Sequence, residues 1–291
     1  KYPVSPKTRI SYLVALLAGL GFPFLWIIVA DFFSYKVRDE DDIVKITDMP
    51  IAGHLPHSRF KTFNVVFEEP DSHVAEAFRS LRTRMQFFTK EIKSPVILIS
   101  SSMPEEGKTF TAINLTSVYS LMGKKTVLVG FDLRKPKIYT DFGINNDMGV
   151  STWLIGKDSL DDVIKNTKHQ NLSIIPAGPI PPNPSELTSS SKTDELLKLL
   201  RERFDYIIID SPPIGSFSDT LYLATIADTC LIIVRQNITL RHMLEGTIAD
   251  LKICNIKSAS LIINDIASDG KGFGYDKSNT YGNEKKSQFK N

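Results

Sequence analysis

The sequence has few cysteines and little excess charge. Cys230 and Cys254 are its only two cysteines, and both lie in apolar helix or strand patterns, which favours reduced core residues over a disulfide or a metal pair. The formal net charge of +2 argues neither for nor against nucleic-acid binding. With 291 residues, of which 42% are hydrophobic, the chain can bury one large core and still carry appendages.

One long apolar run occupies residues 10–30, ISYLVALLAGLGFPFLWIIVA. It contains no charged residue and is long enough to cross the hydrocarbon core of a membrane as a helix. Tyr12, Trp26 and Tyr35 lie near its ends, as interfacial aromatic residues do, and Pro23 is compatible with a kinked membrane helix. A signal peptide fits poorly because the run is too long and lacks a small-residue cleavage site. A buried core helix is the other alternative.

The most informative segment is VILISSSMPEEGKT, residues 96–109. An apolar run, a short loop and a helical pattern follow one another, which is the layout of a phosphate-binding loop. Backbone N–H groups at the start of a helix hold phosphate oxygens, because they are unpaired and lie at the positive end of its dipole. Gly107 permits close approach, Lys108 reaches the β- and γ-phosphates, and the Thr109 hydroxyl ligates Mg²⁺.

This loop departs from the general pattern, since Ser102 stands where the first glycine is usual. An isolated Glu-Gly-Lys-Thr is as compatible with a strand-to-helix turn and a solvated lysine as with a nucleotide site. Two later motifs favour the nucleotide site.

The later motifs are TVLVGFDLRKP and YIIIDSPP. Asp132 follows the first apolar strand and is placed to bind Mg²⁺ or its water shell, while Arg134 and Lys135 could hold phosphate or a neighbouring acid. Asp210 ends the second strand, where P-loop enzymes place an aspartate linked to Mg²⁺. A helix cap after a strand is the alternative role for each aspartate.

The chain alternates short apolar runs with helical patterns. Strands are predicted at 96–100, 126–129, 172–176, 206–210, 229–234 and 260–264, and helices at 72–90, 109–121, 160–165, 192–203, 218–227 and 241–253. Strands made of continuous Val, Ile and Leu are buried on both faces. We therefore predict an α/β fold of the P-loop NTPase type, a mostly parallel sheet with helices on both faces, preceded by one transmembrane helix.

The helix predicted at 72–90 has a charged side. Glu76, Arg79 and Arg82 are three residues apart and so line up along one side of the helix. Taken alone, this row indicates surface salt bridges, which contribute little to stability.

The segments EAFRSLRTRM, SSMPEEGKT, VLVGFDLRKP, PPNPSELTSS and YIIIDSPPI together resemble the bacterial tyrosine kinases (BY-kinases). These are the Wzc-like polysaccharide co-polymerases of capsule and exopolysaccharide export, and the resemblance covers nearly the whole chain. It implies a protein-tyrosine autokinase that uses ATP and Mg²⁺. Its phosphorylation cycle would regulate polysaccharide polymerisation and export.

The resemblance implies a role for each matching residue. Catalysis is implied for Lys108, Asp132 and Asp210. The implied nucleotide contacts are Glu106, Gly107, Lys108, Thr109, Phe110, Arg134 and Asn264, and the implied Mg²⁺ ligands are Thr109, Asp132 and Asp210. Glu76, Arg79 and Arg82 match the Glu-x-x-Arg-x-x-Arg subunit-contact motif of the family, which implies a ring of subunits, commonly an octamer, in place of a simple salt-bridge row.

The C-terminal residues 269–291 are polar and Gly-rich, so we predict a disordered tail. The resemblance makes Tyr275 and Tyr281 the phosphate acceptors of neighbouring subunits. A flexible tail with chance tyrosines is the alternative. Each phosphorylation would add roughly −1.5 to −2 charges, so phosphorylated tails would repel one another and favour ring disassembly.

The resemblance also implies five segments. They are the end of a periplasmic proline-rich segment (1–9), a transmembrane helix (10–30), a juxtamembrane linker (31–67), a cytoplasmic P-loop kinase domain (68–268) and the tail (269–291). The chain begins with Lys1, and we expect it to be a piece of a longer protein. Since ATP is cytoplasmic, we place it in the bacterial inner membrane with the kinase domain in the cytoplasm. The implied partners are the polysaccharide export and polymerase machinery and a protein-tyrosine phosphatase, and no nucleic acid.

Departures from the family pattern keep other functions open. Glu105 and Gly130 stand where the family has glycine and aspartate. An extra carboxylate at Glu105 should weaken nucleotide binding unless it points away or pairs with a basic group. The alternative function is a catalytically weak nucleotide-binding scaffold of the export machinery. A partitioning-type ATPase is disfavoured, because Met103 stands where that group has lysine.

Overall fold

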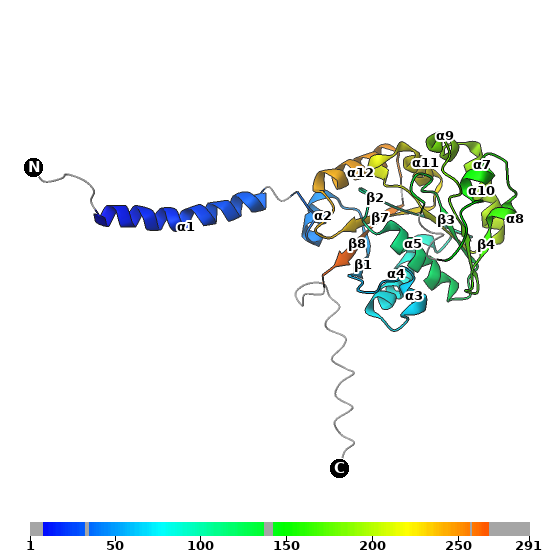
Figure 1. The fold of residues 1–291 in the computed structure, drawn as a ribbon, viewed down its shortest axis with the longest axis horizontal. Helices are drawn as coiled ribbons and strands as arrows, with labels where there is room; N and C mark the ends of the chain where they lie inside the picture. Colours follow the sequence, from blue (N-terminus) through cyan, green and yellow to red (C-terminus); the bar gives the residue numbers. More distant parts are fainter. Residues whose placement is uncertain (1–7, 33–34, 137–141, 257, 268–291) are drawn as a thin grey trace, which may run out of the picture.

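A computed structural model describes residues 8–32, 35–136, 142–256 and 258–267 (Figure 1). Its centre is an eight-stranded sheet with the order β1-β8-β7-β2-β6-β3-β5-β4. The strands are β1 (Ile51–Pro56), β2 (Val96–Ser101), β3 (Thr126–Gly130), β4 (Lys165–Asn166), β5 (Leu172–Ile175), β6 (Tyr206–Asp210), β7 (Thr229–Arg235) and β8 (Ala259–Ile266). Pairing is parallel except between β4 and β5, so the predicted mostly parallel sheet is confirmed.

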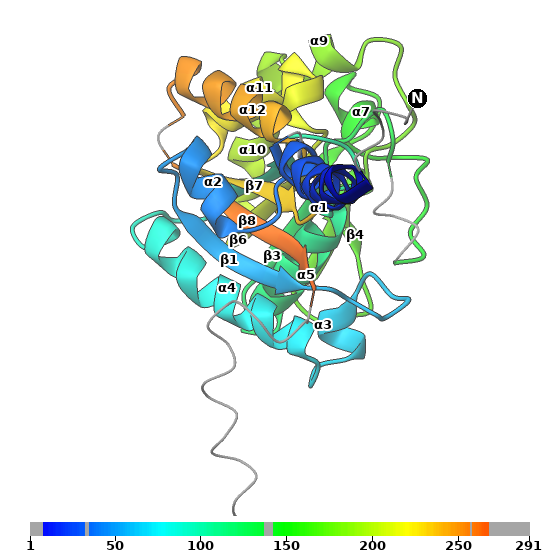
Figure 2. The same ribbon diagram turned by 90° about the vertical axis from the view of Figure 1, so that its left-hand side faces the viewer.

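Helices cover both faces of the sheet (Figure 2). They are α3 (Val65–Glu68), α4 (His73–Thr89), α5 (Lys108–Ser120), α7 (Val150–Leu154), α8 (Leu160–Val163), α9 (Pro184–Thr188), α10 (Ser191–Arg203), α11 (Ser218–Ile226) and α12 (Arg241–Ile253), with a 3₁₀ turn, η1, at Ile214–Ser216. Alternate residues of β2 belong to different buried clusters. Leu98 lies in the same cluster as Leu223, whereas Ile99 lies with Phe78 and Ile113.

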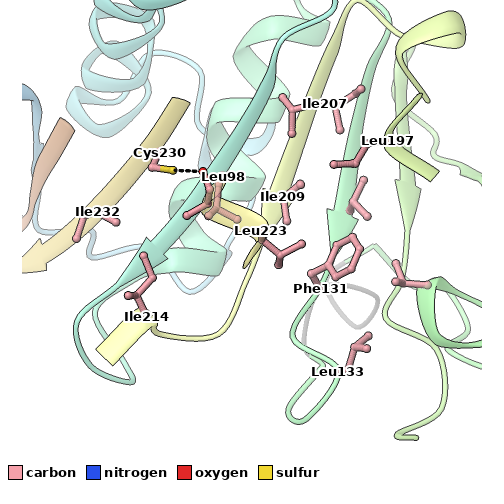
Figure 3. Close-up of a cluster of buried hydrophobic side chains, with 14 of the residues drawn as sticks. Leu98, Phe131, Leu133, Leu197, Ile207, Ile209, Ile214, Leu223, Cys230 and Ile232 are labelled. Carbon is pink, nitrogen blue, oxygen red and sulfur yellow. Dashed lines mark hydrogen bonds between the residues drawn. The ribbon is translucent and has the colours of Figure 1, made fainter. Parts of the chain in front are cut away.

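Figure 3 shows part of the buried cluster that contains Leu98 and Leu223, with Cys230 beside Leu98. Cys230 is fully buried, and burial raises the pKa of its thiol to about 12. It is the reduced core residue that we predicted. Cys254 is only half-buried, just after α12, because the helix ends there at the surface.

The segment predicted as a linker is partly folded. Lys36 pairs with Leu240 in an isolated antiparallel bridge, and α2 (Glu40–Ile46) and β1 follow. The strand β1 was not predicted because its run IAGHLP is short and has no alternation of apolar and polar residues. It extends the sheet through β8 and buries Ala52 and Leu55.

Residues Thr8–Phe32 form one helix, α1, with Pro23 inside it. Figure 1 shows α1 projecting away from the α/β domain. In the part of the chain that the structure describes, no helix combines the length and the apolar character that crossing a bilayer requires. The helix predicted at residues 10–30 is confirmed by α1. That this helix spans a membrane stays a prediction.

Candidate nucleotide-binding site

The loop between β2 and α5 has the backbone geometry of a phosphate-binding loop. Gly107 precedes α5 with a φ of 98°, in the left-handed region that glycine enters without steric cost. A Cβ at this position would lie 2.1 Å from Asn264 Nδ2, so the site requires glycine. The helix starts at Lys108, and its first N–H groups have no acceptor within the helix. These N–H groups lie where the anion site is predicted.

The Lys108 side chain is held against this loop. Its Nζ atom donates a hydrogen bond to Ser101 Oγ at 3.1 Å, and Ser101 Oγ donates to the Met103 carbonyl at 2.6 Å. The side chain is 9% exposed. The ammonium group therefore lies at the loop, as a phosphate-binding lysine must.

Thr109 and Asp210 meet although they lie far apart in the sequence. Thr109 Oγ1 donates to Asp210 Oδ2 at 2.7 Å. The parallel pairing of β2 with β6 sets Asp210 opposite Ile99, so the end of β6 lies beside the loop that follows β2. A hydroxyl and a carboxylate are the hard oxygen donors that suit Mg²⁺, which takes few protein ligands and keeps several waters.

Asp132 lies in the turn after β3, next to Asp210. The Phe131 N–H donates to the Asp210 carbonyl at 2.8 Å. Asp132 Oδ1 accepts from the N–H groups of Arg134 at 3.2 Å and Lys135 at 2.9 Å. These contacts organise the turn, and no helix that Asp132 could cap begins there among the described residues. Among the described residues, no group of three or more His, Cys, Asp and Glu could hold a metal ion.

Arg134 binds a neighbouring acid, which is one of its two predicted roles. It pairs with Asp219 at 3.3 Å, donates to Ser185 Oγ at 2.8 Å and lies 4.2 Å above the ring of Phe217. Asp219 is 4% exposed, so the ion pair is largely shielded from water. Ser185 belongs to the segment PPNPSELTSS, and this contact ties that segment to the second motif.

The Glu106 side chain is buried and bonded within the protein, near Lys108, whose charge favours the ionised carboxylate. Its Oε2 atom accepts from the Met103 N–H at 2.8 Å, and its Oε1 atom is bonded to Thr239 Oγ1. Burial raises the pKa of this carboxyl, although the bonds from Thr239 and Met103 act in the opposite direction. Since both carboxyl oxygens already have partners, the backbone is the part of Glu106 available for the predicted nucleotide contact.

The Glu105 side chain is not buried in the loop, and its effect on nucleotide binding stays a prediction. Its side chain is exposed, while its carbonyl accepts from Arg235 Nη1 at 2.8 Å. The residue has a φ of 66°, a conformation that glycine adopts more readily than glutamate. Glutamate in place of glycine at position 105 therefore imposes strain on the backbone.

Two further predicted nucleotide contacts have structural partners here. Asn264 Nδ2 donates to the Glu106 carbonyl at 2.8 Å, so Asn264 supports the loop from β8. The ring of Phe110 packs edge-on against Phe63 and Phe78. Its backbone N–H is the group that remains for an anion.

The predicted subunit-contact residues lie along α4, remote in sequence from the loop. Arg79 pairs with Glu76 at 3.0 Å and donates to the Pro70 carbonyl at 2.7 Å, and Arg82 is half-buried with no hydrogen-bond partner for its Nε among the described residues. Tyr275 and Tyr281 lie outside the described residues.

Sequence reasoning missed Arg235 and Thr239. Arg235 ends β7 as Asp210 ends β6, so the general placement of ligands at the C-terminal ends of parallel strands could have pointed to it. Thr239 lies in the loop after β7 and carries no comparable signal.

Fold and site together define a P-loop nucleotide-binding protein. A family model described as an AAA domain matches residues 95–257. The tyrosine-protein kinase YwqD of Bacillus subtilis is 32% identical over 71% of this chain and 87% of its own length. The tyrosine-protein kinase wzc of Salmonella typhimurium is 32% identical over 93% of this chain. The kinase domain of the Escherichia coli tyrosine kinase ETK superposes with a TM-score of 0.75 at 25% identity, over 82% of this chain and 100% of that domain.

These similarities place the chain in a family. It belongs to the bacterial tyrosine-protein kinases. It spans 40% of the length of the Salmonella relative and 39% of that of ptk from Acinetobacter johnsonii.

Proposed function

We propose that the chain is an ATP- and Mg²⁺-dependent protein-tyrosine autokinase. The observation that carries the proposal is the 2.7 Å hydrogen bond between Thr109 and Asp210, formed next to Lys108 at the start of α5. Phosphoryl transfer from ATP needs a phosphate cradle, a positive charge and oxygen donors for Mg²⁺. The start of α5, the Lys108 ammonium group and the Thr109–Asp210 pair would supply these three groups. The names of the relatives support tyrosine as the acceptor.

Each group has a defined task in this proposal. Lys108 and the N–H groups that follow Gly107 bind phosphate oxygens and stabilise the charge on the transferring phosphoryl group. Thr109 and Asp210 would hold Mg²⁺, which when bound would neutralise phosphate charge. Asp210 lies opposite Gly130 in the pairing of β3 with β6, and Gly130 is the position at which the family has an aspartate. We propose that Asp210 helps Asp132 to take the proton of the tyrosine hydroxyl, a step for which a loose transition state needs little assistance.

We propose an inner-membrane location for the chain, with the kinase domain in the cytoplasm. Large apolar side chains along α1, among them Leu13, Leu17 and Trp26, are exposed, and a bilayer would cover them. Membrane fractionation of cells that express the chain with and without residues 8–32 tests the location.

We propose that subunits assemble through α4 and phosphorylate one another. Glu76, Arg79 and Arg82 would form the contact, and Tyr275 or Tyr281 would be the acceptor. Phosphorylation, reversed by a protein-tyrosine phosphatase, would regulate the polysaccharide export and polymerase machinery.

The Lys108→Met variant tests the kinase activity. Purified wild-type protein incubated with Mg²⁺ and ATP should gain phosphotyrosine at Tyr275 or Tyr281, mapped by mass spectrometry, and Lys108→Met should gain none. Lys157→Met is the matched control because Lys157 is exposed, and it should be labelled normally. Labelling of Lys108→Met at the wild-type level would refute the assignment.

The second function is a scaffold that binds nucleotide with little catalysis, and Gly130 is the observation in its favour. Wild-type protein that binds ATP but gains no phosphotyrosine, alone or with cell membranes added, would favour this scaffold over the kinase.

A further inference from the structure

The phosphate loop contains a backbone conformation that needs outside support. Glu105 has a φ of 66°, in a region that residues with a side chain occupy only when their surroundings hold them there. Two residues later the chain reaches Gly107 and the first N–H groups of α5. A change in the Glu105 backbone would therefore reorient the anion site.

Arg235 provides direct support for this conformation. Its Nη1 atom donates to the Glu105 carbonyl at 2.8 Å, and its Nε atom donates to Asp265 Oδ2 at 2.8 Å. Asp265 also accepts from His57. Although burial alone would raise the pKa of Asp265, the bonds from His57 and Arg235 hold it below its usual value. The guanidinium is thus anchored to a charged carboxylate while it binds the loop.

A second connection runs through the backbone of the same residue. The Arg235 N–H donates to Thr239 Oγ1 at 2.8 Å, and Thr239 is bonded to the buried Glu106 carboxyl. Arg235 therefore supports both residues that precede Gly107. Two of its side-chain donors, Nε and Nη1, are directed at Asp265 and at the loop, which indicates that Arg235 acts on the loop.

We propose that Arg235 is a positioning residue, which holds Glu105 in its left-handed conformation and so orients the anion-binding N–H groups of Gly107 and Lys108. This role rests on the proposed nucleotide-binding function. It arises from the presence of glutamate at position 105, because glycine would adopt the same backbone conformation without support.

Nucleotide affinity in a double-mutant cycle tests the proposal. We would measure the Kd of a fluorescent ATP analogue with Mg²⁺ for wild type, Arg235→Gln, Glu105→Gly and the double variant. Arg235→Gln should weaken binding on the order of tenfold, as expected for the loss of one charge-assisted hydrogen bond. In the Glu105→Gly background the same change should cost less than about threefold, since glycine needs no support.

The chain offers a closely matched control. Arg201 donates to the carbonyl of Ser94 at 2.8 Å and pairs with Asp228 at 2.8 Å, and Ser94 has a φ of 54°. This arrangement repeats that of Arg235 at the opposite end of β2. Arg201→Gln should lower stability as Arg235→Gln does and leave the Kd unchanged.

Three results would overturn the inference. They are an unchanged Kd in Arg235→Gln, an equal loss with and without Glu105→Gly, and a similar loss in Arg201→Gln. If Arg235→Gln does not fold, Arg235→Lys replaces it, because lysine keeps the charge but cannot bridge two acceptors as the planar guanidinium does. Arg235→Lys should weaken nucleotide binding less than Arg235→Gln, and Glu105→Gly should again reduce the loss. A wild-type protein without ATP affinity would overturn the proposed function, whereas a missing rescue overturns only the role of Arg235.

Discussion

Replacing Gly107 by alanine tests how the loop is held, because two effects at this position can be separated. The residue has a φ of 98°, and an added Cβ would lie 2.1 Å from Asn264 Nδ2. That amide group donates to the Glu106 carbonyl at 2.8 Å. The methyl group therefore imposes backbone strain and also displaces a hydrogen-bond donor.

The expected loss of stability follows from these two effects. A residue with a Cβ in the left-handed region costs about 1–2 kcal/mol. Moving Asn264 leaves the buried Glu106 carbonyl without its donor, which costs about 1–3 kcal/mol. Gly107→Ala should thus lower the free energy of unfolding by about 2–5 kcal/mol, the sum of the two effects.

The measurement is urea unfolding followed by circular dichroism, with unchanged m-values as a condition. Asn264→Ala already removes the hydrogen bond, so in that background Gly107→Ala should cost only the backbone strain, about 1–2 kcal/mol. Gly246 provides the control, since it lies inside α12 with no atom within 4 Å of an added Cβ. Gly246→Ala should stabilise the protein by up to about 1 kcal/mol. Equal costs of Gly107→Ala with and without Asn264 would refute the reasoning.

Two further predictions concern Asp210 and Glu106. Asp210→Asn should weaken Mg²⁺-ATP binding by about tenfold or more, because the site loses its charged oxygen donor, whereas ATP binding without Mg²⁺ should change little. Calorimetry with and without Mg²⁺ measures both affinities. An equal loss of affinity in the two conditions would contradict the prediction. Burial raises the pKa of Glu106 above the ordinary value of 4.5, so the folded chain holds this proton more tightly than the unfolded chain. Stability should therefore fall as the pH rises above about 4.5, and Glu106→Gln should remove that part of the pH dependence; a wild-type and a variant curve of the same shape would exclude this contribution.

Much of the fold was predictable because its central strands are continuous apolar runs. The six predicted strands all appear in the sheet. The strands β1 and β4 were missed because they are short and their pairing with β8 and β5 depends on neighbours distant in the sequence. A short strand of this kind carries little local signal, and its formation is decided by the edge to which it pairs.

The site was predictable in part for the same reason. Lys108 and Thr109 follow one strand after a short loop and Asp210 ends another, so local sequence places all three at one edge of the sheet. The roles of individual side chains were harder to predict. The Glu106 carboxyl is bonded to Thr239 and Arg134 binds Asp219, because each found a buried partner from a segment far along the chain.

The sequence by itself determined the class of the protein, since strand, loop and helix lie next to one another in the phosphate-binding motif and need no distant contact to be recognised. Only the tertiary structure decided what holds that motif in shape. Arg235 reaches Glu105 across 130 residues, and Asn264 reaches Glu106 across 158. The physical reason is the parallel register of β2, β7 and β8, which brings the C-terminal ends of these strands to one edge of the sheet.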